Sequence, residues 1–274
     1  MSSDEQSGLL LGQQTPPATV YAPQLLFPIP RAQGRATLGD HLASTMYGAD
    51  IWHAYELSWL DATGRPMAKI ARFTVPAESP NIVESKSFKL YLNSLNSHAF
   101  DSANALQNTL ESDLSAVAGA AVKVEICDVD DAEVAPEALE ASCIDDAPLG
   151  VIPERPEPSA LRVNADQLVK ESLCTHLLRS LCPVTGQPDW ASVRIRYEGP
   201  AIDRAGLLAY VLGFRNHQEF HEQCVERMFS DLQRTCSPVS LTIQAFYTRR
   251  GGLDINPLRS TEKHPMPGPR LLRQ

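Results

Sequence analysis

The sequence predicts an α+β fold with two similar modules in tandem, and three observations lead to this prediction. An element order of strand, strand, helix, helix, strand can be read twice along the chain. An acidic stretch with several prolines separates the two copies. The length of 274 residues also exceeds what one hydrophobic core usually organises. We expect an N-terminal arm at residues 1–35, a first module at 36–127, a linker or excursion at 128–165, and a second module at 166–274.

A β-hairpin is expected at the start of the first module. Residues 51–60 and 67–75 each carry alternating apolar side chains, which is the period of a half-buried strand. The sequence between them, Asp-Ala-Thr-Gly-Arg-Pro at 61–66, is rich in turn residues. The arm before this module is rich in Ser, Gln, Pro and Gly, and we expect it to be extended.

Two helices and a strand follow in the first module. Residues 85–95 are expected to form a helix with Ser85 as its N-cap. Leucines at helical spacing predict a second helix over 103–117, which Gly119 ends. Residues 121–129 again alternate apolar and polar side chains, so a strand closes the module.

The second module repeats this order. A hairpin, two helices and a final strand are expected, with a turn inside the hairpin and a break after the last strand. In order, these are strand 171–181, turn 182–189, strand 190–197, helix 202–214, helix 220–232, strand 241–247 and break 249–252.

Charge and hydropathy exclude several classes of protein. The net charge is −9, and residues 128–160 hold ten acids and one base, so the remainder is balanced. Without a basic stripe, we expect no direct binding of nucleic acid. No apolar run approaches the roughly 18 residues of a membrane span. The acidic start, residues 1–6, does not resemble a secretory signal, so we expect a soluble, cytoplasmic protein.

Cys182 is the candidate nucleophile among six cysteines, which form no Cys-x-x-Cys pair. It lies in a turn, ahead of Pro183, rather than on a periodic apolar face. Asp189 follows seven residues later and could return beside it across the turn. A thiolate and an acid are what addition to a carbon–nitrogen multiple bond requires. The alternative is a buried cysteine and an aspartate that caps its own turn.

Glu84 and two lysines form a candidate anchor at the start of the expected helix at 85–95. Glu84 could accept two hydrogen bonds from an amidine-like edge such as that of guanine. Lys86 and Lys89, near a helix N-terminus, suit a nucleotide phosphate. The alternative is a helix cap with two solvated lysines.

A zinc site is the main rival interpretation. His217, His221 and Cys224 have i, i+4, i+7 spacing, so they would share one helix face and could bind zinc. Glu222 would point away from that face and could bind a substrate.

The sequence Arg-Arg-Gly-Gly at 249–252 is a candidate for binding a 2′-phosphate or a pyrophosphate. The alternative is an ordinary surface turn. Neither a Gly-x-Gly-x-x-Gly after a strand nor a P-loop is present, so a nicotinamide cofactor would need another scaffold.

Four separated segments together resemble the NADPH-dependent 7-cyano-7-deazaguanine reductases, in their long two-module branch. The resemblance extends from about residue 51 to the C-terminus and weakens in the acidic segment. The four segments are ESKSFKL at 84–90, CPVTGQPDW at 182–190, FHEQCVER at 220–227 and YTRRGGLDINP at 247–257.

This resemblance implies two tandem tunnelling-fold modules, each an antiparallel sheet with two helices, as in GTP cyclohydrolase I. It implies an NADPH-dependent four-electron reduction of the nitrile 7-cyano-7-deazaguanine to 7-aminomethyl-7-deazaguanine, for queuosine in tRNA. NADPH would be a co-substrate, no metal is expected, and a homodimer is expected.

The resemblance also implies residue roles. Cys182 would attack the nitrile carbon to give a thioimide, Asp189 would protonate the nitrogen, and His221 would lie beside the reacting centre. Hydride from NADPH would give a thiohemiaminal that collapses to an imine, and a second NADPH would complete the reduction. The implied substrate-binding residues are Val83, Glu84, Ser85, His221 and Glu222. The implied NADPH-binding residues are Ser85, Lys86, Arg250 and Gly251.

Since the nucleophile and Glu84 fall in different modules, the resemblance implies a site built across a module or subunit boundary. Two alternatives stay open: a zinc-dependent cyclohydrolase on the same scaffold, and a non-catalytic module that binds a pterin or purine. Metal analysis distinguishes the first, and the Cys182→Ala variant distinguishes the second.

Overall fold

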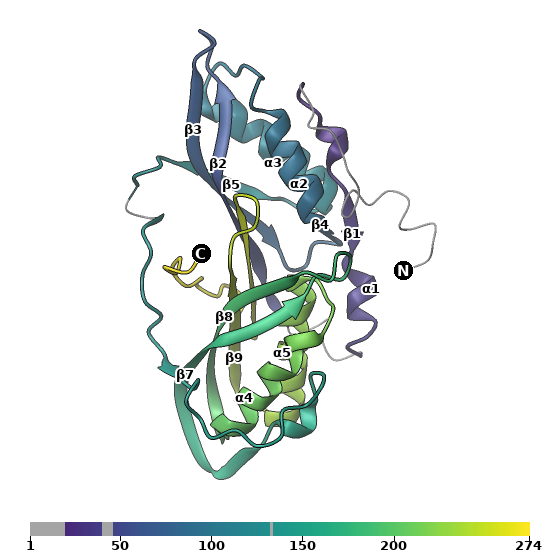
Figure 1. The fold of residues 1–274 in the computed structure, drawn as a ribbon, viewed down its shortest axis with the longest axis vertical. Helices are drawn as coiled ribbons and strands as arrows, with labels where there is room; N and C mark the ends of the chain where they lie inside the picture. Colours follow the sequence, from purple (N-terminus) through teal and green to yellow (C-terminus); the bar gives the residue numbers. More distant parts are fainter. Residues whose placement is uncertain (1–19, 40–45, 132–133) are drawn as a thin grey trace. The chain divides into compact units, whose positions relative to one another are not determined.

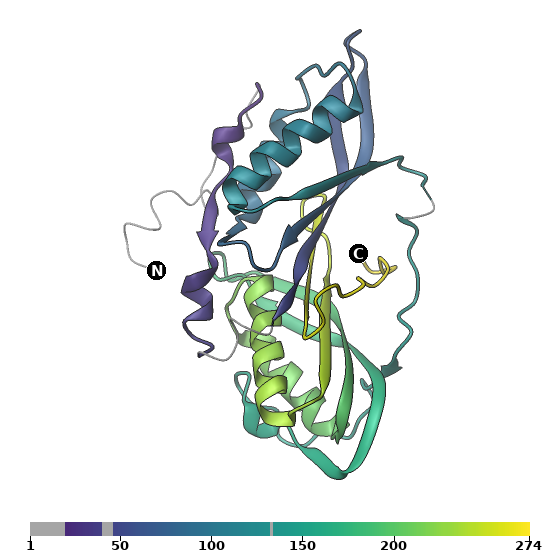
Figure 2. The same ribbon diagram turned by 180° about the vertical axis from the view of Figure 1, so that it is seen from behind.

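The structure is a computed structural model that describes residues 20–39, 46–131 and 134–274. Its chain divides into two compact units, which Figures 1 and 2 show from opposite sides. Unit 1 consists of Met1–Gln33, Asp50–Ala135 and Arg249–Asp254, and unit 2 consists of Gly34–Ala49, Pro136–Thr248 and Ile255–Gln274.

The hairpin predicted in the first module is confirmed. Strands β2 (Tyr47–Leu60) and β3 (Pro66–Pro76) are neighbours, and Asp61 stabilises their turn by accepting bonds from the Thr63 and Arg65 amides. Strand β5 (Lys123–Cys127) pairs antiparallel with the other edge of β3. In unit 1 the order is therefore β5-β3-β2.

Both helices predicted in the first module are confirmed. Helix α2 (Ser85–Ser94) and helix α3 (Ala103–Ala118) follow the hairpin. Ser102 caps α3 by accepting a bond from the Ala105 amide, and Gly119, at φ 72°, ends it. The leucines at helical spacing in α3 are all fully buried, as an amphipathic helix on a sheet requires.

Aromatic side chains fasten α2 to its sheet. Phe88 of α2 packs edge-on against Trp52 of β2 and against Phe73 of β3, with ring centroids 5.2 and 5.0 Å apart. All three side chains are almost completely buried. The position of α2 matters for the site because its first turn carries the Glu84 segment.

The described part of the expected N-terminal arm is not extended throughout. Residues 1–19 of that arm lie outside the described residues. From residue 23 the chain forms a 3-10 turn, strand β1 (Pro28–Pro30) and the short helix α1 (Arg31–Arg35). Strand β1 pairs antiparallel with β4 (Asn81–Val83). Its prolines are consistent with an extended arm, and a strand about fifty residues further along the chain pairs with it.

Unit 2 contains a run of four neighbouring antiparallel strands. A long hairpin of β7 (Val163–Leu181) and β8 (Pro188–Ile202) is followed by β9 (Ser240–Tyr247) and β10 (Leu253–Ser260), in the order β10-β9-β8-β7. The short strand β6 (Ser142–Cys143) pairs parallel with β7. The hairpin predicted in the second module is confirmed, with longer strands than expected.

Helices α4 (Arg204–Leu212) and α5 (His221–Cys236) cover one face of this sheet (Figure 2). A short 3-10 turn, η4 (Gly213–Asn216), separates them. Their apolar side chains, such as Leu207 and Phe229, join residues of β7, β8 and β9 in one hydrophobic core. Both helices were predicted, and the element order read from the sequence is confirmed in each unit.

Strand β10 was not predicted. The Arg-Arg-Gly-Gly sequence suggested a break after the last strand, and no further strand was expected beyond it. In the structure the glycines form a tight turn, and every residue of β10 is buried. A strand buried along its whole length does not show the alternation by which strands are recognised.

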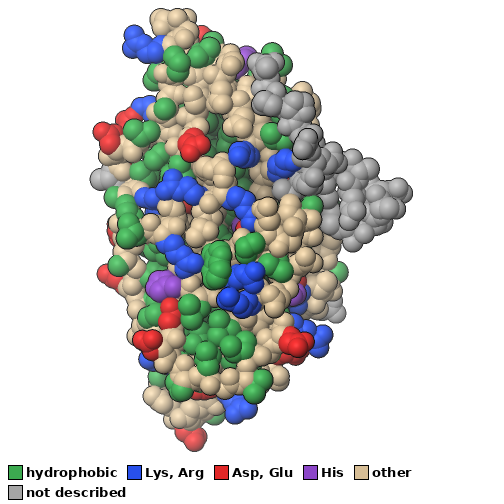
Figure 3. All heavy atoms as spheres, viewed as in Figure 1, with side chains coloured by type: hydrophobic (Ala, Val, Ile, Leu, Met, Phe, Trp, Pro, Cys, Tyr) green, Lys and Arg blue, Asp and Glu red, His purple; other side chains and the backbone are tan. Residues whose placement is uncertain are grey.

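The surface of the described residues mixes side-chain types. On the face drawn in Figure 3, basic, acidic and hydrophobic side chains lie among one another. In β7, the large apolar residues Leu168 and Leu177 are exposed, at 76% and 37%. No helix among the described residues has both the length and the hydropathy to span a membrane.

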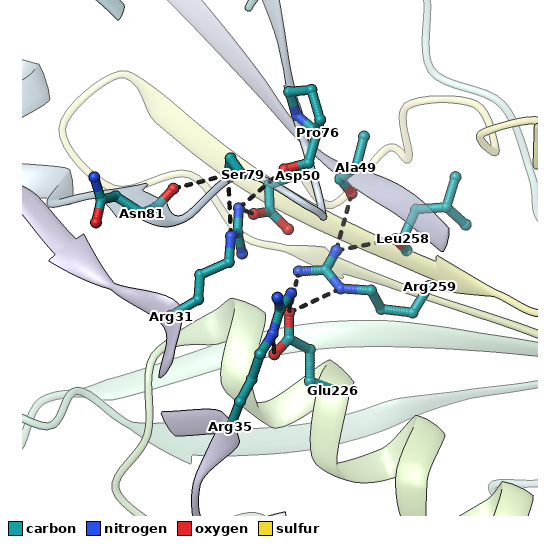
Figure 4. Close-up of polar contacts among 10 residues, drawn as sticks. All are labelled: Arg31, Arg35, Ala49, Asp50, Pro76, Ser79, Asn81, Glu226, Leu258 and Arg259. Carbon is teal, nitrogen blue, oxygen red and sulfur yellow. Dashed lines mark hydrogen bonds and ion pairs between the residues drawn. The ribbon is translucent and has the colours of Figure 1, made fainter. Parts of the chain in front are cut away.

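Each unit contains a buried ion-pair cluster (Figure 4). In unit 1, Arg31 bonds Asp50 at 2.5 Å and Ser79 at 3.1 Å. In unit 2, Glu226 of α5 accepts bonds from both Arg35 and Arg259, at 2.8–3.1 Å. Buried charges are tolerated when they are paired in this way, so these clusters fix the geometry of their elements.

Candidate active site

Cys182 lies in the turn between β7 and β8, as the sequence predicts. Its amide donates to the Gln187 carbonyl, and its carbonyl accepts from the Gly186 amide, both at 2.9 Å. Gly186 has φ 67°, which a glycine adopts without strain. The residue is only 5% exposed, so the thiol is held in a well-defined place by its own turn.

Asp189 is the first acid beyond this turn, and its position differs in detail from the expectation. Its cross-strand partner is Ser180, not Cys182. Cys182 follows the last residue of β7, two residues after Ser180, so the thiol and the acid are both at the turn end of the hairpin. The acid is therefore diagonal to the thiol rather than directly opposite it.

His221 is the first residue of α5 and contacts Asp189. Its Nε2 lies 3.2 Å from Asp189 Oδ2. Its ring stacks on Tyr247, with centroids 3.7 Å apart and an interplanar angle of 11°. The Nδ1 atom is buried and has no hydrogen-bond partner among the described residues. An imidazole fixed in this way can exchange a proton with the carboxyl group on one side and with a ligand on the other.

Tyr247 is a site residue that sequence reasoning missed. It ends β9, directly before the Arg-Arg-Gly-Gly segment, and it is almost completely buried. Burial raises the pKa of its hydroxyl well above the usual value, so it stays protonated. Its position at the end of an apolar strand was the available signal, but stacking on His221 depends on α5.

Burial affects the thiols of three other cysteines in unit 2. It raises the pKa of the Cys224 thiol well above its usual value, and it raises the pKa of both Cys174 and Cys236 to about 11. These thiols stay protonated near neutral pH, and a protonated thiol is a poor nucleophile.

Glu222, next to His221 on α5, is a buried carboxylate at 3% exposure.

The zinc set His217, His221 and Cys224 is not assembled in the described residues. His217 precedes α5, because the helix begins at His221, so the three do not share one helix face. Its Nε2 lies instead 3.0 Å from a Glu219 oxygen. Among the described residues, the His, Cys, Asp and Glu side chains close enough to share a metal ion are a different set, which does not include Cys182.

In unit 1, the structure corrects the cap of α2. Glu84, not Ser85, is the N-cap: its two carboxylate oxygens accept bonds from the Lys86 and Ser87 amides, both at 2.8 Å. Ser85 is the first helical residue. The carboxylate of Glu84 has two oxygens and accepts from two amides at once, whereas the Ser85 hydroxyl has a single oxygen.

This cap changes the anion site expected at α2. The Lys86 and Ser87 amides already bond Glu84, so a phosphate would be held by cationic side chains rather than by these amides. Burial raises the pKa of Glu84 although the two amide bonds and Lys86 oppose this effect. Val83, the neighbouring expected binding residue, is buried at the end of β4.

A tight turn in unit 1 brings Gly251 to α2. The Arg250 amide donates to the Leu253 carbonyl at 2.7 Å, and Gly251 and Gly252 have φ 60° and 83°. A two-residue turn of this kind needs positive φ at both central positions, which explains the glycine pair. A Cβ on Gly251 would lie 2.5 Å from Lys89 Nζ, so the bare backbone is in contact with an ammonium group.

The surroundings of this turn fit a polyanionic dinucleotide such as NADPH. Arg249 lies over the Tyr55 ring at 4.2 Å, and Tyr55 and His53 both bond Asp254, at 2.5 and 2.8 Å. These contacts with β2 hold the turn in place. Cationic side chains and a backbone without side chains are suited to bind a phosphate group. The cations are Lys86, Lys89, Arg249 and Arg250.

The predicted site residues thus form two groups. Unit 2 brings Cys182, Asp189 and His221 to the β7–β8 turn and the start of α5, with Glu222 beside them. Unit 1 brings the first turn of α2 to the Gly251 turn.

Two family models match this chain. A family model described as "Nitrile reductase, 7-cyano-7-deazaguanine-reductase N-term" matches residues 18–126. A second, described as "QueF-like protein", matches residues 188–266. The NADPH-dependent 7-cyano-7-deazaguanine reductases of Burkholderia lata and Burkholderia ambifaria are each 53% identical over 259 residues, which is 94% of this chain and 94% of theirs.

A solved structure of an archaeosine synthase QueF-Like in the apo form is also similar, with a TM-score of 0.31 and 16% identity. The alignment covers 36% of this chain and 96% of that chain.

Proposed function

Because this chain belongs to the family of the NADPH-dependent 7-cyano-7-deazaguanine reductases, we propose that its Cys182 is the nucleophile of a nitrile reduction. The chain is an enzyme that reduces 7-cyano-7-deazaguanine to 7-aminomethyl-7-deazaguanine in queuosine biosynthesis. The observation that carries this conclusion is the 53% identity to curated reductases over 94% of both chains.

The first step takes place on Cys182. Its thiolate adds to the nitrile carbon, so that a carbon–sulfur bond forms and one π bond of the nitrile breaks, giving a thioimide. Its place in the turn between β7 and β8, where its backbone bonds Gly186 and Gln187, supports this role.

Asp189 donates the proton that the nitrile nitrogen needs as the thioimide forms. The carboxyl group lies at the same end of the hairpin as the thiol, and His221 at 3.2 Å holds its orientation. His221 has a second, buried nitrogen with no partner among the described residues, through which it can bind the substrate or pass on a proton.

Two buried carboxylates bind the deazaguanine base. Glu84 and Glu222 are almost completely buried and accept hydrogen bonds from its amidine edge. Val83 and Ser85 flank Glu84 and contact the same ligand. The two oxygens of Glu84 are already oriented by the Lys86 and Ser87 amides, so this acceptor is rigid before substrate arrives.

The NADPH phosphates are held by the turn at Gly251 together with the first turn of α2. Ser85, Lys86, Arg250 and Gly251 supply this binding, with Lys89 beside the glycine backbone. When bound, NADPH supplies the hydrides of the reduction. Each hydride carries two electrons, so the four-electron reduction uses two equivalents of NADPH. No metal is needed for either addition or protonation.

In this proposal the protein acts as a homodimer in the cytoplasm. Its substrate is a small molecule, and it does not bind nucleic acid. On its outer side β7 pairs with β6 over two residues, so most of β7 has one strand neighbour among the described residues. Leu168 and Leu177 are exposed on this strand, and a second copy can bury them. A catalytic thiol suits a reducing compartment. Light scattering that gives a monomeric mass would contradict the dimer.

The proposed modules are residues 36–127 and 166–274, joined by 128–165 and preceded by an arm at 1–35. The family matches at 18–126 and 188–266 support a division into two parts.

Intact-mass measurement tests the proposed function. Protein mixed with 7-cyano-7-deazaguanine should gain one adduct of the mass of the nitrile, and NADPH should discharge it as the amine. Cys182→Ala should form no adduct, while the control Cys127→Ser should behave as the parent. An adduct that persists in Cys182→Ala would place the nucleophile on another thiol. No adduct together with no oxidation of NADPH would contradict the activity itself.

A further inference from the structure

Two cysteines and a histidine in unit 2 form a cluster that the reduction does not use. The ligand atoms of Cys143, Cys174 and His176 all lie within 4.8 Å of one another. Cys143 and Cys174 are register partners in the parallel pair of β6 and β7, and His176 follows two residues later. The three ligands therefore come from two hydrogen-bonded strands, which hold them in place.

The neighbours of this cluster orient it for a cation. His176 Nδ1 lies 2.8 Å from the Ser192 hydroxyl, which fixes the ring and leaves Nε2 for coordination. A ligating histidine ordinarily has such a bond on its other nitrogen. The Asp145 carboxylate accepts bonds from the Thr175 hydroxyl at 2.5 Å and from the His176 amide at 3.2 Å. Its negative charge lies beside the cluster without being one of the three ligands.

We propose that Cys143, Cys174 and His176 form a binding site for a thiophilic divalent cation, with Zn²⁺ as the best fit. Two sulfurs and one imidazole nitrogen are a donor set that zinc prefers, and water can complete a tetrahedron. Cys143 and His176 are exposed, so an ion can enter, while Cys174 is buried. Binding releases the protons of the two thiols to solvent.

The site would hold the segment between β5 and β7 in place. Ser142 and Cys143 belong to that segment, and the backbone already bonds there through the Ile144 amide to the Cys174 carbonyl at 2.9 Å. A bound ion adds a side-chain link from this segment to β7. The site is separate from Cys182, Asp189 and His221, and it takes no part in hydride or proton transfer.

Cobalt titration of the full chain tests the proposal. Co²⁺ bound by thiolates gives an intense near-ultraviolet charge-transfer band. With metal-free protein, a non-thiol reductant and about pH 8, we expect this band to saturate at one equivalent, and Zn²⁺ to abolish it. Cys143→Ser and His176→Ala change exposed side chains, so they should fold normally and lose at least about 100-fold in affinity. Cys127→Ser is the matched control and should bind as the parent.

Three outcomes would overturn the site. These are no band in the parent protein, a band that persists in both Cys143→Ser and His176→Ala, and an intact mass showing that Cys143 and Cys174 are joined as a disulfide under reductant. Nitrile reduction is measured in parallel. Both variants should retain it, so failure of the metal site is distinguishable from failure of the reductase assignment.

Discussion

The imidazole of His221 lies flat against the phenol ring of Tyr247, with centroids 3.7 Å apart. The two residues come from the start of α5 and the end of β9. The stack fixes the plane of the imidazole, and the same imidazole holds Asp189 at 3.2 Å. Tyr247 therefore acts as a positioning residue for the proposed acid, through His221.

Tyr247→Leu should lower kcat by about 10- to 100-fold, because an imidazole that shifts by about 1 Å misplaces Asp189. Tyr247→Phe keeps the ring and should stay near the parent. Steady-state kinetics and the pH profile of kcat measure both. If Tyr247→Leu merely loses stability, its pH profile will match that of the parent, and the positioning role is wrong.

Asp189→Asn should still bind 7-cyano-7-deazaguanine but lose reduction, since an amide does not supply the proton that a carboxylic acid supplies. A loss of general-acid catalysis corresponds to about 10²- to 10⁴-fold in kcat. NADPH oxidation and ligand binding are measured on the same preparation, with exposed Asp146→Asn as the control. Full activity in Asp189→Asn removes this residue from the acid role.

Gly251→Ala should raise the KM for NADPH by about tenfold, equivalent to ~1.4 kcal/mol. The new methyl group would fall 2.5 Å from Lys89 Nζ, at a φ of 60° that alanine adopts with strain. Gly64 is the matched control: it has φ 82° and nothing within 4 Å of an added Cβ. Gly64→Ala should therefore show only the strain, about 1–2 kcal/mol of stability, and an unchanged KM. Equal KM changes in both variants would contradict a cofactor role for the Gly251 turn.

Glu219 should contribute stability that depends on pH. Burial alone would raise the pKa of its carboxyl, but hydrogen bonds from His217 and Arg227 hold the pKa below the usual 4.5. Because the folded-state pKa is the lower one, the stabilisation is complete above pH 4.5 and is lost as the pH falls through the folded value.

Glu219→Gln should therefore lower the free energy of unfolding by about 1–3 kcal/mol at neutral pH. The difference from the parent should shrink when urea unfolding is repeated at about pH 4 and below. Glu198→Gln is the control, since its pair with Lys170 is largely exposed and should matter little. A difference that is constant with pH would mean that the charge of Glu219 is not what stabilises the fold.

Local patterns in the sequence were sufficient for much of the fold and for the choice of candidate residues. The hairpin strands and the helices α3 and α5 follow from hydrophobic periods of two and 3.6 residues. These periods arise because each strand or helix packs one face against the core. The turn that holds Cys182 follows from its prolines and glycine. The four motifs, in order, identified the family, as the curated relatives confirm.

What the sequence left open was decided by contacts between distant segments. Ser85 looked like the cap of α2, but Glu84 is buried against the chain near Phe27 and takes the helix amides itself. His217 had the spacing of a zinc ligand, but α5 begins only at His221.

The sequence by itself therefore determined the repeated α+β order, the turn around Cys182 and the family, because each depends on residues close together in the chain. Only the tertiary structure decided that β10 is a buried strand, that Tyr247 stacks on His221, and that Cys143 lies beside Cys174. These features depend on burial and on contacts between residues far apart in the sequence. Neither can be inferred from a local sequence pattern.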